Sequence, residues 1–208
     1  MIVDSVILDV DYVSSNMRKE DRMELSAGYS ASPLASLLAG FRLSKPNAYS
    51  IVEVFAAISE SKDIDYVAEN MRQADLDEIK AVGVEDPRQA LLESYRNSNP
   101  ECYSVMHRTV PVAMFGVVPD AEDPRHGSIW MLGTDHVTDD FPVAFLRQCR
   151  RFLPILMSDY EMVSNKVDKR NTVHIKWLKW MGFTIIREVI YGPENRPFYE
   201  FARINEHV

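Results

Sequence analysis

The chain has 208 residues, of which 46% are hydrophobic, and it carries a formal net charge of -8. That length and apolar content suit one domain of ordinary size plus an appendage, and they exclude a tail or linker. The acidic balance argues against a general nucleic-acid binder, whose domain is usually basic. The apolar N-terminus is interrupted by Asp4, Asp9 and Asp11, so it is not typical of a signal peptide, and no run reaches the ~20 apolar residues of a membrane span. We expect a cytosolic protein.

The two cysteines, Cys102 and Cys149, have neither the spacing of a zinc site nor that of a redox motif. This favours two buried thiols in a reducing compartment. The five histidines also lack metal-ligand spacing, so we expect no metal.

An internal repeat occupies the first half of the chain. Residues 11–52 align without a gap on residues 65–106, and 17 of the 42 positions are identical, among them the pairs Asp21/Asp75 and Glu24/Glu78. A repeat of this length indicates that the same supersecondary unit is formed twice. We therefore predict a truncated repeat in residues 1–63 and a complete domain in residues 64–208.

Each copy shows signals for a strand, two helices and another strand. In the second copy an extended segment around Val67 precedes Asp75, which is expected to cap a helix, with Glu78 in the partner position of a capping box. Asp-Pro at residues 86–87 places a second cap before a proline at the first helical position. A strand is expected at 103–106.

The chain continues with two strand patterns, at residues 110–117 and 128–133, which are expected to form a hairpin. Residues 134–140 form an acidic connection. Pro142 then stands where the first turn of a helix should begin, and alternating residues from 162 to 167 predict another strand.

A further helix is expected to begin after Asn171 or Thr172, either of which can cap it, and to end at Gly182 in the left-handed conformation. Apolar residues such as Val173 and Trp180 surround most of this helix, which predicts that it is almost entirely buried. Two final strands are expected, separated by a turn at residues 192–193.

This order of elements resembles the GCN5-related N-acetyltransferase (GNAT) fold. It is most similar to the compact GNAT-like proteins of short-tailed phages, often described as internal virion proteins or as acetyltransferases. The resemblance covers the C-terminal two-thirds of the chain and is carried by MRQADLDEI at 71–79, VAMFGVVP at 112–119, SIWMLGT at 128–134 and VDKRNTVHIKWLKWMGF at 167–183. It implies an α/β (α+β) fold in which helices flank a mixed, mostly antiparallel sheet, preceded by a partial duplication of its N-terminal half.

Members of this family transfer an acyl group from acetyl-CoA to an amine, and they hold the coenzyme pyrophosphate on backbone amides at a helix N-terminus. The corresponding loop here is 133–143, which keeps only Gly133 of the family's glycine signature and is rich in aspartate. The resemblance therefore implies five candidate residues for binding the coenzyme. They are Gly133, Thr134, Val143, Arg147 and Asn171.

The resemblance places Leu178 where many members of the family have a tyrosine that protonates the leaving thiolate. Attack by an amine also needs a general base with a pKa near neutrality. The catalytic candidates in the coenzyme loop are Asp135 and His136. Glu101 and His107 are alternatives, although acids of this kind are more often helix caps or solvated loop residues. His174 is interpreted as a packed core or interface histidine.

Two hypotheses of function follow. The first is a phage-encoded, acetyl-CoA-dependent N-acyltransferase with a degenerate coenzyme loop. The alternative is a non-catalytic GNAT-fold protein that serves virion assembly or host interaction, located in the host cytoplasm or in the virion. Half a fold exposes a sheet edge, so we expect residues 1–63 to pack on the sheet or to bind another subunit or a protein partner.

Overall fold

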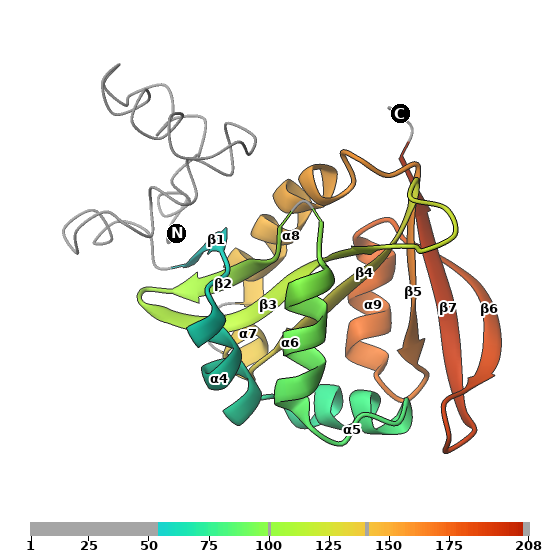
Figure 1. Ribbon diagram of the computed structural model, residues 1–208, viewed down its shortest axis with the longest axis horizontal. Coiled ribbons are helices and arrows are strands. Elements are labelled where there is room, and N and C mark those ends of the chain that lie inside the picture. Colours follow the sequence, from blue (N-terminus) through green and yellow to red (C-terminus); the bar gives the residue numbers. More distant parts are fainter. Residues whose placement is uncertain (1–53, 100, 140–141, 206–208) are drawn as a thin grey trace.

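The structure is a computed structural model that describes residues 54–99, 101–139 and 142–205, without the side chains of 138–139, 142–144 and 146–148 (Figure 1). Seven strands form one sheet in the order β1-β2-β3-β4-β5-β7-β6. They are β1 Val54–Ile58, β2 Tyr103–His107, β3 Val110–Pro119, β4 His126–Gly133, β5 Met162–Asp168, β6 Thr184–Tyr191 and β7 Arg196–Ile204. All neighbours are antiparallel except β4 and β5. The expected mixed, mostly antiparallel sheet is confirmed.

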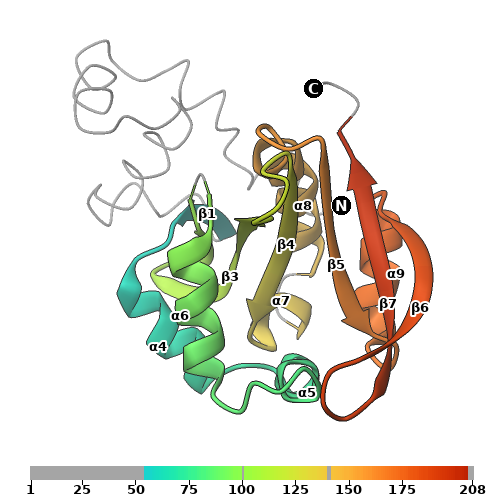
Figure 2. The same cartoon turned by 45° about the vertical axis from the view of Figure 1, so that its right-hand side comes forward.

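Helices cover both faces of this sheet (Figures 1 and 2). They are α4 Ser61–Glu69, α5 Gln73–Ala81, α6 Pro87–Asn97, α7 His136–Asp139, α8 Pro142–Leu156 and α9 Thr172–Trp180. Side chains of β4 alternate between two hydrophobic clusters. Trp130 and Leu132 join the cluster beneath α4, α5 and α6, whereas Ile129 and Met131 join the cluster beneath α8 and α9. The chain is therefore a three-layer structure whose middle layer is the sheet.

The predictions that rest on local signals agree with the structure. The Asp86 side chain accepts a hydrogen bond of 2.9 Å from the Arg88 amide, and α6 begins at proline as expected. β3 and β4 form the predicted hairpin. Asn171 caps α9 by accepting from the His174 amide at 3.3 Å, and Gly182 ends that helix at φ +85°.

The prediction of an extended segment around Val67 is wrong, because residues 61–69 form α4. A capping box between Glu60 and Asp63 begins this helix. Its buried residues Ile64, Val67 and Ala68 have helical spacing and pack towards β3 and α6. The apolar spacing over this segment was therefore the stronger signal.

The predicted capping box at Asp75 and Glu78 is also wrong. Arg72 is the N-cap residue of α5 and makes no side-chain capping bond, so Asp75 and Glu78 lie inside the helix. Both carboxylates instead take part in the polar cluster described below.

The prediction that α9 is almost entirely buried fails on one side of the helix. Ile175 and Leu178 pack on the sheet, but Val173 is 62% exposed and Trp180 is 42% exposed. The helix covers the sheet with one face, and its outer face is partly exposed.

β1 forms the edge of the sheet beside β2, so part of the segment 1–63 contributes to it. Residues 1–53 lie outside the described residues, and the predicted repeat structure and the boundary at residue 63 remain predictions. None of the described helices has both the length and the apolar character needed to cross a membrane.

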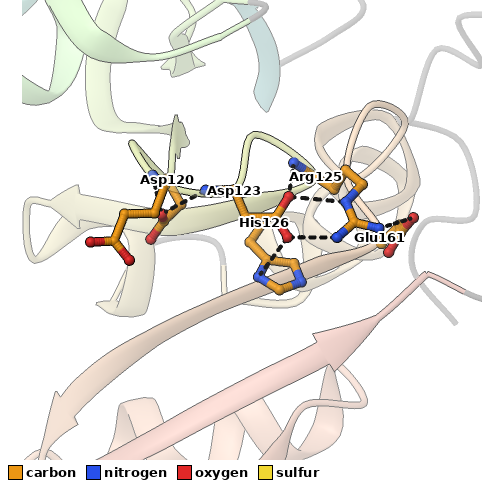
Figure 3. A network of polar contacts seen from close by, with 6 residues as sticks. Asp120, Asp123, Arg125, His126 and Glu161 are labelled. Atoms are coloured by element: carbon orange, nitrogen blue, oxygen red, sulfur yellow. Dashed lines mark hydrogen bonds and ion pairs between the residues drawn. The ribbon is translucent and has the colours of Figure 1, made fainter.

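The parallel pair β4–β5 is joined at one end only. Residues 126–128 of β4 pair with residues 162–164 of β5. Beyond these residues β4 continues to Gly133 and β5 to Asp168, but the two strands no longer pair with each other. At the joined end, Arg125 lies between Asp123 and Glu161, with ion pairs of 2.8 and 3.4 Å (Figure 3). The Glu161 amide also donates to the Arg125 carbonyl oxygen at 2.7 Å. We call this the closed end, and the separated ends of the strands the open end.

Candidate functional site

A cavity of about 340 Å³ lies where β4 and β5 separate. Its walls include residues of α5 and α6 from one face of the sheet and of α8 and α9 from the other. Both faces of β4, with Trp130 and Met131 for example, also line it, so the cavity passes through the sheet between the two strands. Most of its lining is apolar. Its polar side chains include Glu78, Glu93, Ser94, Asn165, Lys166, His174 and Tyr191.

A buried polar cluster ties α5 to the open end of β4. Asp75 pairs with Arg72 at 2.7 Å, and both side chains are almost fully buried. Asp75 also accepts a hydrogen bond of 2.9 Å from the Gly133 amide. The Arg72 amide donates in turn to the Gly133 carbonyl oxygen at 2.9 Å. The first turn of α5 and the last residue of β4 are therefore fixed together.

Asn171 extends this cluster across the opening to α9. Its side-chain amide donates to a Glu78 carboxylate oxygen at 3.3 Å, while its side-chain oxygen caps α9. The pKa of Glu78 is raised to about 7. Burial is the main cause, the nearby Asp75 carboxylate adds to it, and the hydrogen bond from Asn171 opposes the rise. Glu78 thus presents to the cavity a carboxyl group that exchanges a proton near neutral pH.

Glu78 was not among the predicted catalytic residues, because its sequence position was interpreted as part of a helix cap. A usable signal was present. Asp75, Glu78 and Ile79 have the spacing i, i+3 and i+4, which places two acids on the same helical face as a core residue. Acids on a buried face are unusual and often mark a functional site.

The predicted cofactor-binding residues Gly133 and Thr134 are buried at the open end. The Gly133 amide is bonded to Asp75, and the Thr134 amide donates to the Val112 carbonyl oxygen at 2.9 Å. The Thr134 hydroxyl donates to the same oxygen at 3.0 Å. These amides are therefore hydrogen-bonded within the protein and not directed at a phosphate position.

The remaining predicted residues lie in three places. Asp135 and His136 are exposed, next to the cluster, and are not part of the cavity lining. Val143 and Arg147 belong to α8, but their side chains lie outside the described residues. Asn171 is in direct contact with Glu78, a carboxylate that lines the cavity.

The two alternative bases, Glu101 and His107, belong to the region of β2. Glu101 precedes β2 and accepts from the Tyr103 hydroxyl at 3.2 Å, and His107 ends the same strand. Neither lines the cavity.

One face of α9 forms a wall of the cavity. Its residues, spaced as one helical stripe, are His174, Trp177, Leu178 and Met181. Leu178 is buried and aliphatic, as the sequence requires. Burial lowers the pKa of His174 to about 3, and the positive charge of Arg72 adds to this effect, so the imidazole is neutral. His174 is thus a half-buried histidine that lines the cavity.

No family model matches the chain, and no curated protein matches it in sequence. Solved structures are similar to it. An acetyltransferase of the GNAT family from Streptococcus pneumoniae is 14% identical with a TM-score of 0.51, over 73% of this chain and 99% of that one. An aminoglycoside N(6')-acetyltransferase from Legionella pneumophila is 15% identical with a TM-score of 0.56, over 73% and 92%. The aminoglycoside acetyltransferase AAC(6')-Ib, in complex with coenzyme A, is 13% identical with a TM-score of 0.55, over 74% and 95%. The chain therefore has the GNAT fold.

Proposed function

We propose that this protein is an acyltransferase that moves an acyl group from acetyl-CoA to an amine. The observation that carries the proposal is Glu78, a carboxyl group with a pKa raised to about 7 that lines the cavity between β4 and β5. A general base works best when its pKa lies near the operating pH. Structural neighbours that are acetyltransferases, one of them in complex with coenzyme A, support the same reaction class.

The residues present fit one end of acetyl-CoA better than the other. Most of the cavity lining is apolar, which suits the acyl-bearing end. For the pyrophosphate, the amides of Gly133 and Thr134 are already bonded. For the phosphate end, the first turn of α8, which begins at Pro142, is the remaining candidate, because the first amides of a helix have no partner within the helix.

When bound, acetyl-CoA supplies an acyl group activated as a thioester. In the transfer, the amine nitrogen would form a bond to the acyl carbon as the carbon–sulfur bond breaks, and the coenzyme would leave as a thiolate that takes a proton from water. Glu78 in its ionised form accepts the proton that the attacking amine loses. The hydrogen bond from Asn171 orients the carboxylate and favours its ionised form.

Glu78→Gln tests this assignment. With acetyl-CoA and a panel of primary amines, monitored by release of the free thiol, kcat/KM of the variant is expected to fall by about 10²–10⁴-fold. The wild-type rate should rise with pH through about 7, and the variant should lose this rise. Asp77→Asn, an exposed acid on the same helix, is the matched control and should keep the wild-type rate. Full activity in Glu78→Gln would exclude Glu78 as the base.

A phage origin remains part of the proposal and rests on the sequence resemblance alone. The second candidate is a non-catalytic role in virion assembly or host interaction, with residues 1–63 contacting another subunit or a protein partner. It is favoured by one observation, namely that the amides of Gly133 and Thr134 are used within the protein. Calorimetry with millimolar acetyl-CoA separates the two candidates, because the second expects no heat of binding.

A further inference from the structure

The charged side chains that line the cavity lie on one face of the sheet. Glu78 and Glu93 come from α5 and α6, which cover that face. Val163 and Val167 of β5 join the hydrophobic cluster beneath α8 and α9. Because side chains alternate along a strand, Lys166 lies on the opposite face, together with Glu78 and Glu93. The described α8 residues that line the cavity are uncharged, so a charged acyl acceptor fits the α5 side.

The Lys166 ammonium group has no carboxylate partner among the described residues. Its Nζ atom lies 4.7 Å from the centroid of the Tyr191 ring, which also lines the cavity. Glu200 is the residue opposite Lys166 in β7, but its carboxylate is paired with Arg187 at 2.6 Å. The Lys166 side chain is half-buried, and charges that are taken out of water are usually paired. It therefore offers a positive charge to a ligand.

Glu78 and Lys166 act on neighbouring parts of the same strand. The Glu78 carboxyl group lies next to the Asp168 backbone amide, whose hydrogen bond opposes the rise in its pKa. Lys166 lies two residues before Asp168 in β5, which is about 7 Å of strand. A small molecule can therefore contact the base and the ammonium group at the same time.

These charges select the kind of acceptor. If the reacting amine lies at Glu78, the rest of the acceptor faces Lys166, which attracts a carboxylate and repels a second ammonium group. Glu93 attracts a second ammonium group only weakly, because it is exposed and already accepts a hydrogen bond of 2.9 Å from Gln89. A phosphate carries more negative charge than one lysine balances, and both glutamates repel it.

We propose that the acyl acceptor is a primary amine that also carries a carboxylate, with its amine at Glu78 and its carboxylate at Lys166. This inference rests on the proposed acyltransferase function and names the class of acceptor. Lys166 binds the carboxylate and takes no part in the proton transfer. A short amino acid has both groups a few bonds apart and is the simplest molecule of this class.

Initial rates of the full chain with acetyl-CoA and matched acceptors test this, with release of the free thiol as the readout. Glycine, β-alanine and γ-aminobutyrate are each compared with the alkylamine that has the same number of carbons. Putrescine, which has a second ammonium group, is compared with γ-aminobutyrate. In the wild type, kcat/KM of the best amino acid should exceed that of its alkylamine by about 10–100-fold, the range of one hydrogen bond between charged groups. Putrescine should be a poorer acceptor than γ-aminobutyrate.

Two substitutions of Lys166 assign this preference to its charge. Lys166→Met removes the charge and keeps most of the length of the side chain, so the preference for the amino acid should disappear, mainly through a higher KM. Lys166→Glu should reverse the order, so that putrescine becomes a better acceptor than γ-aminobutyrate. Lys80→Met is the matched control. Lys80 is exposed on α5 and does not line the cavity, so this variant should keep the wild-type ratio.

The possible failures are distinguishable. A wild-type protein that acylates alkylamines or putrescine as well as the amino acids overturns the inference, and so does an unchanged ratio in Lys166→Met. In both cases the acyltransferase proposal stands, because acyl transfer is still observed. If no amine is acylated, the proposed function itself fails, and this inference fails with it.

Discussion

The two ends of the β4–β5 pair carry similar charged residues in opposite environments. At the closed end, Asp123, Arg125 and Glu161 form ion pairs at the surface (Figure 3). At the open end, Arg72 and Asp75 form an ion pair that is almost completely buried. Exposed ion pairs contribute little to stability because water competes for both partners. A buried pair is different, since loss of one partner leaves a charge in a medium that cannot solvate it.

The same contrast appears in the acidity of the carboxyl groups. Hydrogen bonds from Arg125 lower the pKa of Asp123 to about 2 at the closed end. Burial raises the pKa of Glu78 to about 7 at the open end. Exposure with a cationic partner thus keeps one carboxylate ionised, while burial beside another acid makes the other a proton acceptor near neutral pH. The open end is therefore where proton-transfer chemistry is expected.

The largest effect is expected from Asp75→Ala. This change leaves the Arg72 charge buried and removes the acceptor of the Gly133 amide. We expect a loss of about 3–5 kcal/mol in the free energy of unfolding, measured by urea denaturation.

A double variant sharpens this test. In Arg72→Met with Asp75→Asn the buried charges are removed together, and the asparagine keeps an acceptor for the Gly133 amide. Its loss should be clearly smaller than that of Asp75→Ala. If Asp75→Ala is no less stable than the double variant, then leaving the Arg72 charge buried without Asp75 has little cost, and the ion pair does not stabilise the open end.

The next effect is a dependence of stability on pH. Glu78 has a pKa of about 7 in the folded protein and an ordinary value of 4.5. Because the folded pKa is the higher one, the folded state holds the proton more tightly. The stabilisation is complete below about pH 4.5 and is lost as the pH rises through 7. The loss amounts to at most about 3 kcal/mol.

Glu78→Gln isolates this contribution, because glutamine does not titrate. The difference in unfolding free energy between wild type and variant should change between pH 5 and pH 8, with the wild type losing stability relative to the variant. Urea titrations at several pH values measure it. A difference that stays constant over this range would show that Glu78 titrates near its ordinary pKa, and it would remove the basis for its role as a base.

The sequence predicted those elements whose signals are local. The Asp-Pro start of α6, the β3–β4 hairpin and the Asn171 cap of α9 each depend on a few adjacent residues. At Val67 the strand expected from the order of the elements competed with an apolar helical spacing, and packing of α4 decided for the helix. Local signals therefore predict an element reliably when the residues fit only one kind of secondary structure at that position.

The site could be predicted only in part, because it depends on contacts between distant segments. Asn171 was identified from the resemblance, and it does lie at the open end. The role of Glu78 depends on the separation of β4 from β5 and on two neighbours, Asp75 on the same helix and Asn171 at the start of α9. Nothing in the residues adjacent to Glu78 indicates that separation, so a cap was the natural interpretation.

The smallest effect is expected at the closed end, from Arg125→Ala. The side chain is 63% exposed, so its ion pairs with Asp123 and Glu161 compete with water and salt. We expect the thermal midpoint to fall by about 4 °C or less, and the difference from wild type to shrink in 1 M sodium chloride. The backbone bond between Glu161 and Arg125 is unaffected by the change and keeps the strands joined. Arg125→Ala could instead lower the thermal midpoint as much as Asp75→Ala does, with no dependence on salt. That result would mean that the side-chain network and not the backbone pairing joins β4 to β5 at this end.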